Sequence, residues 1–257
     1  MKTKYLSALI GFSATVAIAV FIHSCAGGKK APEKESVEQI TTNADASGLV
    51  ITLTFKKGSS FNHPLLAIWL EDTNNRYIET LYVSESIGKG IFQHGDKTGG
   101  EWQPGPVRRP AALPYWGHQR GVQAPDGYYL PTPENPVADA ITGPTPQGNF
   151  ILQSKSSGNL SGPFKVMLEI NQSWDWNDFW TNNKFPEEEQ YKTSSQPAVV
   201  YECTIDPGNL LQENEMKPVG HSHYSGKDGN LYPDLETLTT ALEIAEKITV
   251  RVSPVKN

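Results

Sequence analysis

The sequence predicts an all-β domain, and three observations support this fold class. First, the 257 residues include 22 Gly and 19 Pro, which makes the chain rich in turns. Second, several short segments alternate apolar and polar residues with a period of two, which is typical of half-buried strands. Third, Leu, Ala and Glu do not dominate the composition, as they usually do in helical domains.

The predicted strands begin close to residue 49. A half-buried strand is expected there, because apolar residues alternate with polar ones at Leu49, Ile51, Leu53 and Phe55. Residues 65–70 are apolar on both faces, which favours a central strand. A polar turn separates them from a strand at 77–83, so these two strands are predicted to form an antiparallel hairpin. Later strands are predicted at 149–154, 164–170, 197–205, 217–224 and 248–252.

Two long segments between these strands are rich in aromatic residues. Residues 84–147 combine many Gly and Pro with Trp and Tyr side chains, whose apolar area must be covered. We therefore expect a long ordered insertion packed over one edge or end of the sheets, and such segments are often functional. Residues 171–191 form a second aromatic loop.

One short helix is expected near the C-terminus. Residues 234–246 place Leu235, Leu238 and Leu242 at helical spacing, with Asp234 as a suitable N-cap. Together with about seven to nine short antiparallel strands, this predicts a single β-sandwich of immunoglobulin-like type over residues 48–257. A jelly roll is the alternative.

The N-terminus has the layout of a secretory signal. Lys2 and Lys4 precede 18 uncharged residues that end at Ile22. Beginning at the last residue of this segment, the run Ile22-His23-Ser24-Cys25 resembles a bacterial lipobox, although His23 stands where a small residue is usual. An uncleaved transmembrane anchor is the alternative, because 18 apolar residues can just span a bilayer.

The resemblance to a lipobox implies a lipid anchor. Residues 1–24 would be removed as a signal peptide, Cys25 would carry the acyl chains, and residues 25–47 would form a flexible tether. Ala26 follows in place of the Asp that retains many lipoproteins at the inner membrane. We therefore expect the outer membrane, on its periplasmic side or on the cell surface.

The charge of the chain excludes some classes of partner. Loss of the two lysines in residues 1–24 moves the formal net charge from −6 to −8. An acidic chain without a basic patch argues against nucleic acid as a partner. The pair Arg108-Arg109 is expected to be solvated or paired with carboxylates. Cys203 is the only cysteine besides Cys25 and lies in an apolar run, which predicts a buried, unreactive thiol and no intramolecular disulfide.

Two blocks of the sequence resemble a family of uncharacterised exported bacterial proteins, periplasmic or lipid-anchored. The first block is residues 67–72 followed by 77–81, and the second is residues 139–148, where Pro144 replaces the usual Ala. Residues 164–170 correspond to a strand of that family that ends in Glu. The resemblance implies an envelope protein with an immunoglobulin-like sandwich, and it carries over no catalytic residue.

The histidines are candidates for a metal site. His221 and His223 are two residues apart, so on a strand they would share one face, which suits metal binding. His118 and His94 lie in the long insertion and could complete a divalent metal site. The alternative is that these side chains hydrogen-bond to loops and strand ends. No other cofactor is expected.

The aromatic loops are candidates for a binding surface. Flat aromatic faces beside carboxylates suit a glycan or another ring-shaped ligand, and the candidate residues are Trp174, Trp176, Trp180, Asp175 and Trp116. The alternative is that these Trp side chains plug the ends of the sandwich. Carboxylate pairs that would suit a glycosidase also occur, at Asp175 with Asp178, Asp126 with Glu134 and Asp234 with Glu236.

The sequence therefore favours a membrane-anchored envelope lipoprotein that acts as a binding or accessory module. Its expected partners are the membrane, through the lipid, and a glycan or an envelope protein. A metal-dependent or carbohydrate-active enzyme that uses residues 84–147 and the region of His221 and His223 is the alternative. No catalytic residue is predicted.

Overall fold

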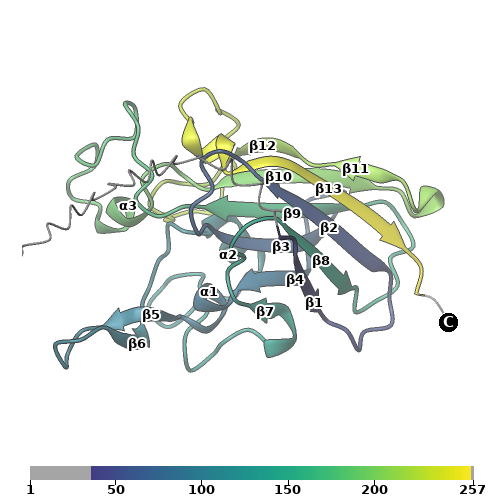
Figure 1. Ribbon diagram of the computed structural model, residues 1–257, viewed down its shortest axis with the longest axis horizontal. Coiled ribbons are helices and arrows are strands. Elements are labelled where there is room, and N and C mark those ends of the chain that lie inside the picture. The colour runs from purple at the N-terminus through teal and green to yellow at the C-terminus, as the bar shows by residue number, and fades with distance from the viewer. Residues whose placement is uncertain (1–35, 256–257) are drawn as a thin grey trace, which may run out of the picture. The chain divides into compact units, whose positions relative to one another are not determined.

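A computed structural model describes residues 36–255 of the chain. Within them, two β-sheets pack face to face, so the predicted all-β class is confirmed (Figure 1). The signal segment, Cys25 and the first part of the predicted tether lie outside the described residues.

The first sheet has five strands. In spatial order they are β1 (Glu38–Thr42), β8 (Phe150–Lys155), β2 (Val50–Lys57), β13 (Ala245–Ser253) and β11 (Glu213–Glu215). All neighbours are antiparallel except β1 and β8, which run parallel. The predicted alternation in β2 is confirmed, because Ile51, Leu53 and Phe55 are buried between the sheets.

The second sheet has six strands. In spatial order they are β12 (Lys217–His221), β10 (Val199–Ile205), β9 (Phe164–Asn171), β3 (Leu65–Asp72), β4 (Tyr77–Ser84) and β7 (Thr142–Gly143). The predicted hairpin of β3 and β4 is confirmed as an antiparallel pair. Cys203 in β10 is buried, as predicted, and burial raises the pKa of its thiol to about 12.

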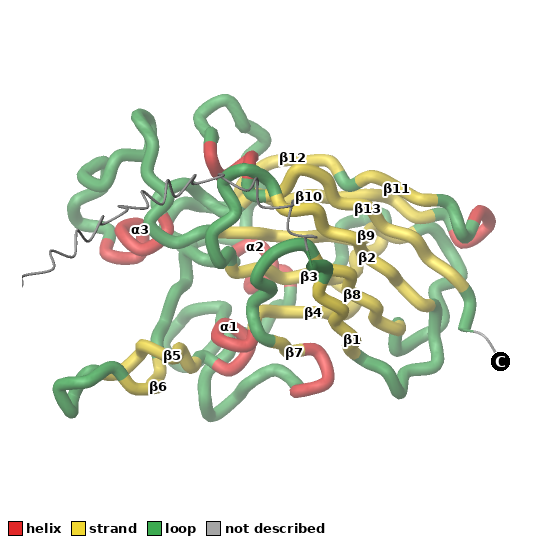
Figure 2. The backbone as a smooth tube through the Cα atoms, in the orientation of Figure 1, coloured by secondary structure: helices red, strands yellow, loops and turns green. Residues whose placement is uncertain are grey.

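The remaining elements are short and belong mostly to loops (Figure 2). A separate hairpin consists of β5 (Ile91–Asp96) and β6 (Gln103–Pro106). The α-helices are α1 (Glu85–Lys89), α2 (Pro114–Gln119) and α3 (Glu189–Ser194). Single 3-10 turns lie at Asp139–Ile141, Pro207–Asn209 and Thr240–Glu243.

The long insertion packs over the outer face of the six-stranded sheet, where an edge or an end had been expected. The outward-facing residues of β3, Leu65, Ala67 and Trp69, are apolar and form a second buried cluster with residues of the insertion. This explains why β3 is apolar on both faces: one face meets the other sheet and the opposite face meets the insertion.

The predicted tether is too long at its C-terminal end. Residues 38–42 form β1, which pairs with β8. Ile40 packs against the core, and the Thr42 hydroxyl donates a hydrogen bond to the carbonyl of Leu81 (2.8 Å). Ile and Thr suit a strand, so these few residues add an edge to the sheet in spite of the polar composition around them.

The predicted helix over 234–246 is wrong. The structure has only the 3-10 turn Thr240–Glu243 there, and β13 begins at Ala245. Leu238 is buried, and Leu235 and Leu242 pack against the core from successive turns. The spacing of these three leucines therefore does not come from a helix, because they reach the end of the sandwich core from separate turns. The side chains of Thr239 and Thr240 bond to the neighbouring aromatic loop, which fixes a non-helical path.

Candidate functional site

The insertion divides into two parts that meet the sheet differently. We call residues 85–109 the hairpin segment and residues 110–137 the covering segment. The covering segment contributes Leu113, Tyr115 and Trp116 to the buried cluster on the outer face of the sheet. The Trp116 indole N–H donates to the hydroxyl of Thr80 (2.9 Å) and its side chain is fully buried. Trp116 therefore cannot present a face to a ligand.

A carboxyl group is buried beneath the covering segment. Glu169 in β9 accepts hydrogen bonds from the backbone N–H groups of Trp116 (2.8 Å) and Tyr115 (3.2 Å), in the first turn of α2. Burial raises the pKa of Glu169 from an ordinary 4.5 to about 8, and the two N–H groups oppose that shift only in part. Because the side chain is completely covered, it acts as a structural link between sheet and insertion.

The four candidate histidines do not share one set of contacts, although the rings of His221 and His223 both contact Tyr232. His221 and His223 are buried; Nδ1–H of His221 donates to the carbonyl of Ser222 (2.7 Å), and Nδ1 of His223 accepts from the N–H of Ser225 (3.1 Å). His118 stacks on Tyr129, and its Nδ1–H donates to the carbonyl of Pro114 (2.8 Å). His94 stacks on Trp102 in the β5–β6 hairpin.

The histidines therefore do not form one metal centre. Within residues 36–255, no three His, Cys, Asp or Glu side chains are grouped as a metal ion requires. The local bonds and ring contacts of these imidazoles correspond to the alternative in which they join loops and strand ends.

The aromatic loop after β9 is also mostly structural. Trp180 is buried and packs among Phe185, Tyr191 and Tyr224, and Trp176 packs against the same core. Asp175 accepts a hydrogen bond from the Thr240 hydroxyl (2.5 Å), and burial raises the pKa of its carboxyl. These side chains plug the end of the sandwich.

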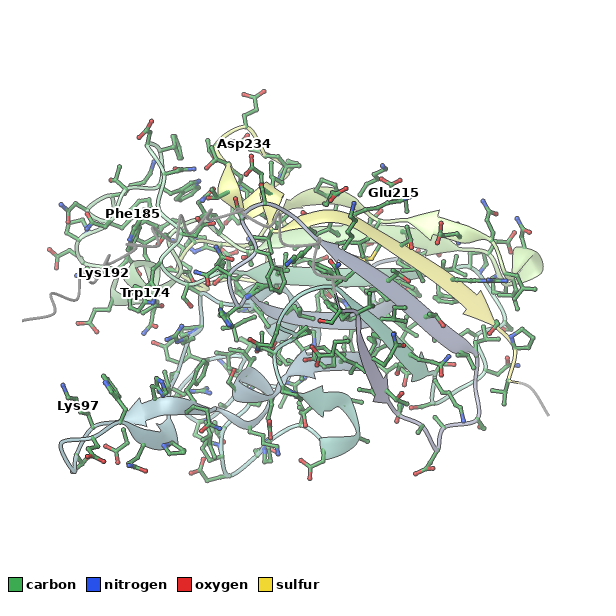
Figure 3. The ribbon with its side chains drawn as sticks, in the orientation of Figure 1. Lys97, Trp174, Phe185, Lys192, Glu215 and Asp234 are labelled. Carbon is green, nitrogen blue, oxygen red and sulfur yellow. The ribbon has the colours of Figure 1, made fainter. Side chains whose placement is uncertain are left out.

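Trp174 is the exposed member of the predicted set, with 58% of its surface accessible. Figure 3 shows it at the same end of the molecule as Phe185 and as Lys192 of α3. Its backbone is left-handed (φ 63°), and its N–H donates to the carbonyl of Thr193 (3.2 Å). The predicted wall of several Trp faces therefore does not form, because Trp116 and Trp180 are covered and lie in different clusters.

The candidate carboxylate pairs are likewise held in local bonds. Asp126 forms an ion pair with Arg108 (2.7 Å), and Asp234 accepts from the N–H of Glu236 (2.9 Å).

A pocket of about 710 Å³ lies between the hairpin segment, the loop before β3 and the loop after β7. This volume is within the range of small-molecule sites, whereas a hollow beside β12 and β13 measures only about 250 Å³. Its lining residues are His63, Glu85, Ser86, Lys89, Ile91, Phe92, Gln93, His94, Val107, Arg109, Pro144, Thr145 and Gln147.

Arg109 is the exceptional residue of this pocket. Its Nη1–H donates to the hydroxyl of Ser173 (2.6 Å), and the guanidinium carbon lies 4.8 Å from the centroid of the Phe92 ring. Nε is buried and has no acceptor among the described residues. Burial lowers the pKa of Arg109, and no acidic side chain of residues 36–255 offsets that effect. The guanidinium nevertheless stays charged, since arginine does not deprotonate in proteins.

The other cation of the pocket is already neutralised. The Lys89 ammonium lies 2.7 Å from a carboxylate oxygen of Glu85 and 3.2 Å from one of Asp139. The pocket therefore combines one guanidinium that has no carboxylate partner among the described residues, the ion pair of Lys89 with Glu85, and walls of apolar and other polar side chains.

Sequence reasoning singled out His94 only as a candidate metal ligand, and it missed Arg109. The sequence predicted that both arginines are solvated or paired with carboxylates. This prediction is confirmed for Arg108, which forms an ion pair with Asp126, and is wrong for Arg109. Adjacent arginines give no sequence signal that distinguishes them, because their partners come from segments that are distant along the chain.

Comparison with protein-family models, with curated proteins and with solved structures finds no match to this chain. Among the described residues, no helix combines the length and the apolar character needed to cross a bilayer.

Proposed function

We propose that this protein is a lipid-anchored module of the bacterial cell envelope that binds a saccharide in the pocket of the hairpin segment. The pocket is the observation that carries the proposal. Ile91, Phe92, Val107 and Pro144 supply apolar surface for the C–H faces of a sugar. Six further polar side chains supply hydrogen bonds for hydroxyl groups: His63, Ser86, Gln93, His94, Thr145 and Gln147.

The anchor in this proposal is the acylated Cys25, on the outer membrane. Palmitate labelling of cells that express the chain tests it, with a matched control at the second cysteine. Wild type and Cys203→Ser should incorporate the label, whereas Cys25→Ser should lose it and leave the membrane fraction. An unlabelled wild-type chain that still fractionates with membranes would contradict the lipid anchor.

The proposal includes the immunoglobulin-like identity of the sandwich, and the strand order supports it. The strands β2, β3, β4, β8, β9 and β10 follow the order B, C, C′, E, F and G of that fold. As in that fold, β9 lies between β3 and β10 in one sheet, and β2 lies beside β8 in the other. Backbone NOEs between these pairs would check the order, and a direct pairing of β3 with β10 would exclude it.

Saccharide binding is tested by titration calorimetry on the full chain in detergent micelles, against a panel of neutral and acidic oligosaccharides. At least one member should bind. Thr145→Trp should abolish its binding by filling the pocket. Thr204→Trp should leave it unchanged, because Thr204 is an exposed residue of β10 that does not line the pocket. Flat heats across the panel, or binding that survives Thr145→Trp, would refute the proposal.

A further inference from the structure

We propose that the pocket selects a saccharide that carries a single carboxylate, and that Arg109 binds this carboxylate. The inference rests on the proposed saccharide binding and specifies the chemical class of its ligand. It depends on how charge is distributed among the residues that line the pocket.

The contrast between two adjacent arginines is the first step. Arg108 donates to both carboxylate oxygens of Asp126 (2.7 and 3.2 Å) and to the carbonyl of Leu130 (3.2 Å), so its charge and its donors are satisfied by the protein. Arg109 has the hydroxyl of Ser173 and the face of Phe92, and neither is an anion. A partly buried guanidinium without an anion is unfavourable, and a bound carboxylate would remove that cost.

The orientation of Arg109 is the second step. Ser173 holds one end of the guanidinium, and the Phe92 ring covers its plane at 4.8 Å. Such support from two sides reduces the side-chain freedom that a ligand would otherwise have to freeze on binding. The arrangement suits recognition of a planar carboxylate better than a non-specific attraction of anions, since the fork of arginine donors matches two coplanar oxygens.

The rest of the lining limits the ligand to one negative charge. Lys89 is neutralised by Glu85 and Asp139, and Glu85 itself would repel a second carboxylate. None of the other side chains that line the pocket is a Lys, Arg, Asp or Glu. The matching ligand therefore has one acidic group at the end of the pocket near Arg109 and neutral hydroxyl groups elsewhere, as in a uronic acid joined to a neutral sugar.

The test compares matched acids and esters on the full chain in detergent micelles. The probes are three disaccharides, glucuronosyl-galactose, galacturonosyl-rhamnose and sialyl-galactose, each with its methyl ester, in which the carboxylate is masked. For at least one pair, wild type should bind the acid at least tenfold more tightly than the ester. Salt should weaken binding of that acid and leave binding of the ester nearly unchanged.

Variants of the two arginines assign the preference to a residue. Arg109→Gln should bind the acid and the ester equally, whereas Arg109→Lys should keep part of the preference because the charge remains. Arg108→Gln is the matched control and should retain the full preference, since Arg108 does not line the pocket. Thermal unfolding of each variant verifies that the sandwich is intact.

The outcomes separate this inference from the proposed function. If wild type binds esters or neutral sugars in the pocket as tightly as acids, the acid selectivity is wrong and saccharide binding stands. If Arg109→Gln keeps the preference, another residue binds the carboxylate and the assignment fails. If no saccharide binds at all, the proposed function fails and the inference fails with it.

Discussion

The two segments of the long insertion differ in composition and in environment, since the hairpin segment is the richer in charged residues and the covering segment the richer in Pro. The covering segment lies on the sheet and buries Leu113, Tyr115 and Trp116. The hairpin segment extends away from the strands, with Lys97 near its tip (Figure 3), and exposes Ile91 and Trp102. One segment therefore completes a core, and the other forms a wall of a pocket.

The surface beneath each segment contributes to this difference, together with the composition of the segment. The outer face of β3 and β9 presents Leu65, Ala67, Trp69 and Met167, so any apolar side chain that reaches it is covered. Ile87 and Phe92 of the hairpin segment still contact that apolar area, whereas Trp102 stays 56% exposed. In such a position an apolar surface is available to a ligand.

The largest expected effect separates the two segments by stability. Trp116→Ala should lower the free energy of unfolding by about 3–5 kcal/mol, because it leaves a cavity over the sheet and removes the indole N–H that donates to the Thr80 hydroxyl. Trp102→Ala should change it by no more than about 0.5 kcal/mol, since Trp102 is 56% exposed. Denaturant unfolding of both variants measures these values. Equal losses would mean that the hairpin is also part of the core.

The second prediction concerns pH and the carboxyl beneath the covering segment. Since the pKa of Glu169 is raised on folding, from an ordinary 4.5 to about 8, the folded chain takes up a proton in that interval. The contribution of Glu169 to the free energy of unfolding is complete below pH 4.5 and is lost as pH rises through 8. In this interval the free energy of unfolding should fall by at most about 1.4 kcal/mol per pH unit.

The matched variant isolates this effect from other titrating groups. Glu169→Gln keeps the size of the side chain and cannot titrate, so its unfolding free energy should vary less with pH than that of wild type. Denaturation series between pH 4.5 and 8 would measure both slopes. Identical slopes would show that Glu169 is ionised in the folded chain throughout that range.

A third prediction tests how tightly the covering segment is held. Gly226 is left-handed (φ 73°), and a Cβ there would lie 2.0 Å from the carbonyl oxygen of Pro110. Gly121 is also left-handed (φ 70°), with nothing within 4 Å of the same position. Gly121→Ala should therefore cost only about 1 kcal/mol of backbone strain. Gly226→Ala should lower the free energy of unfolding by more than this, because the added Cβ also clashes with the Pro110 carbonyl. The same denaturant unfolding assay would measure both losses.

Strand patterns in the sequence predicted the central strands of both sheets, but they missed β1, β7 and β11 and were insufficient for the loops. The alternation in β2 and the doubly apolar β3 predicted the core correctly, because the period of a strand is a local property. The helix over 234–246 failed because its leucines contact the sandwich end from separate turns, which local spacing cannot reveal.

The candidate site was harder to predict for the same physical reason. Trp116 and Trp174 look alike in the sequence, yet one is fully buried and the other is 58% exposed. Arg108 and Arg109 are neighbours, yet only Arg108 meets a carboxylate, 18 residues further along the chain. Such differences depend on contacts between distant segments and have no local signature.

The smallest expected effect concerns binding by the hairpin. Trp102 stacks on His94, which lines the pocket, but Trp102 does not line it (ring centroids 6.4 Å apart). Trp102→Ala should therefore weaken saccharide binding by less than tenfold, through looser positioning of His94. Calorimetry with the tightest-binding disaccharide acid would measure it. A complete loss of binding would place Trp102 itself in the site.

The insertion is divided into a covering segment that completes a core and a hairpin segment that binds a ligand. The most direct test of this division is hydrogen exchange of the full chain, with and without a saturating disaccharide acid. We expect slower exchange in the hairpin segment and at residues 144–147, and unchanged exchange in the covering segment. Protection confined to residues 110–137, or at the exposed Trp174 loop, would contradict the account.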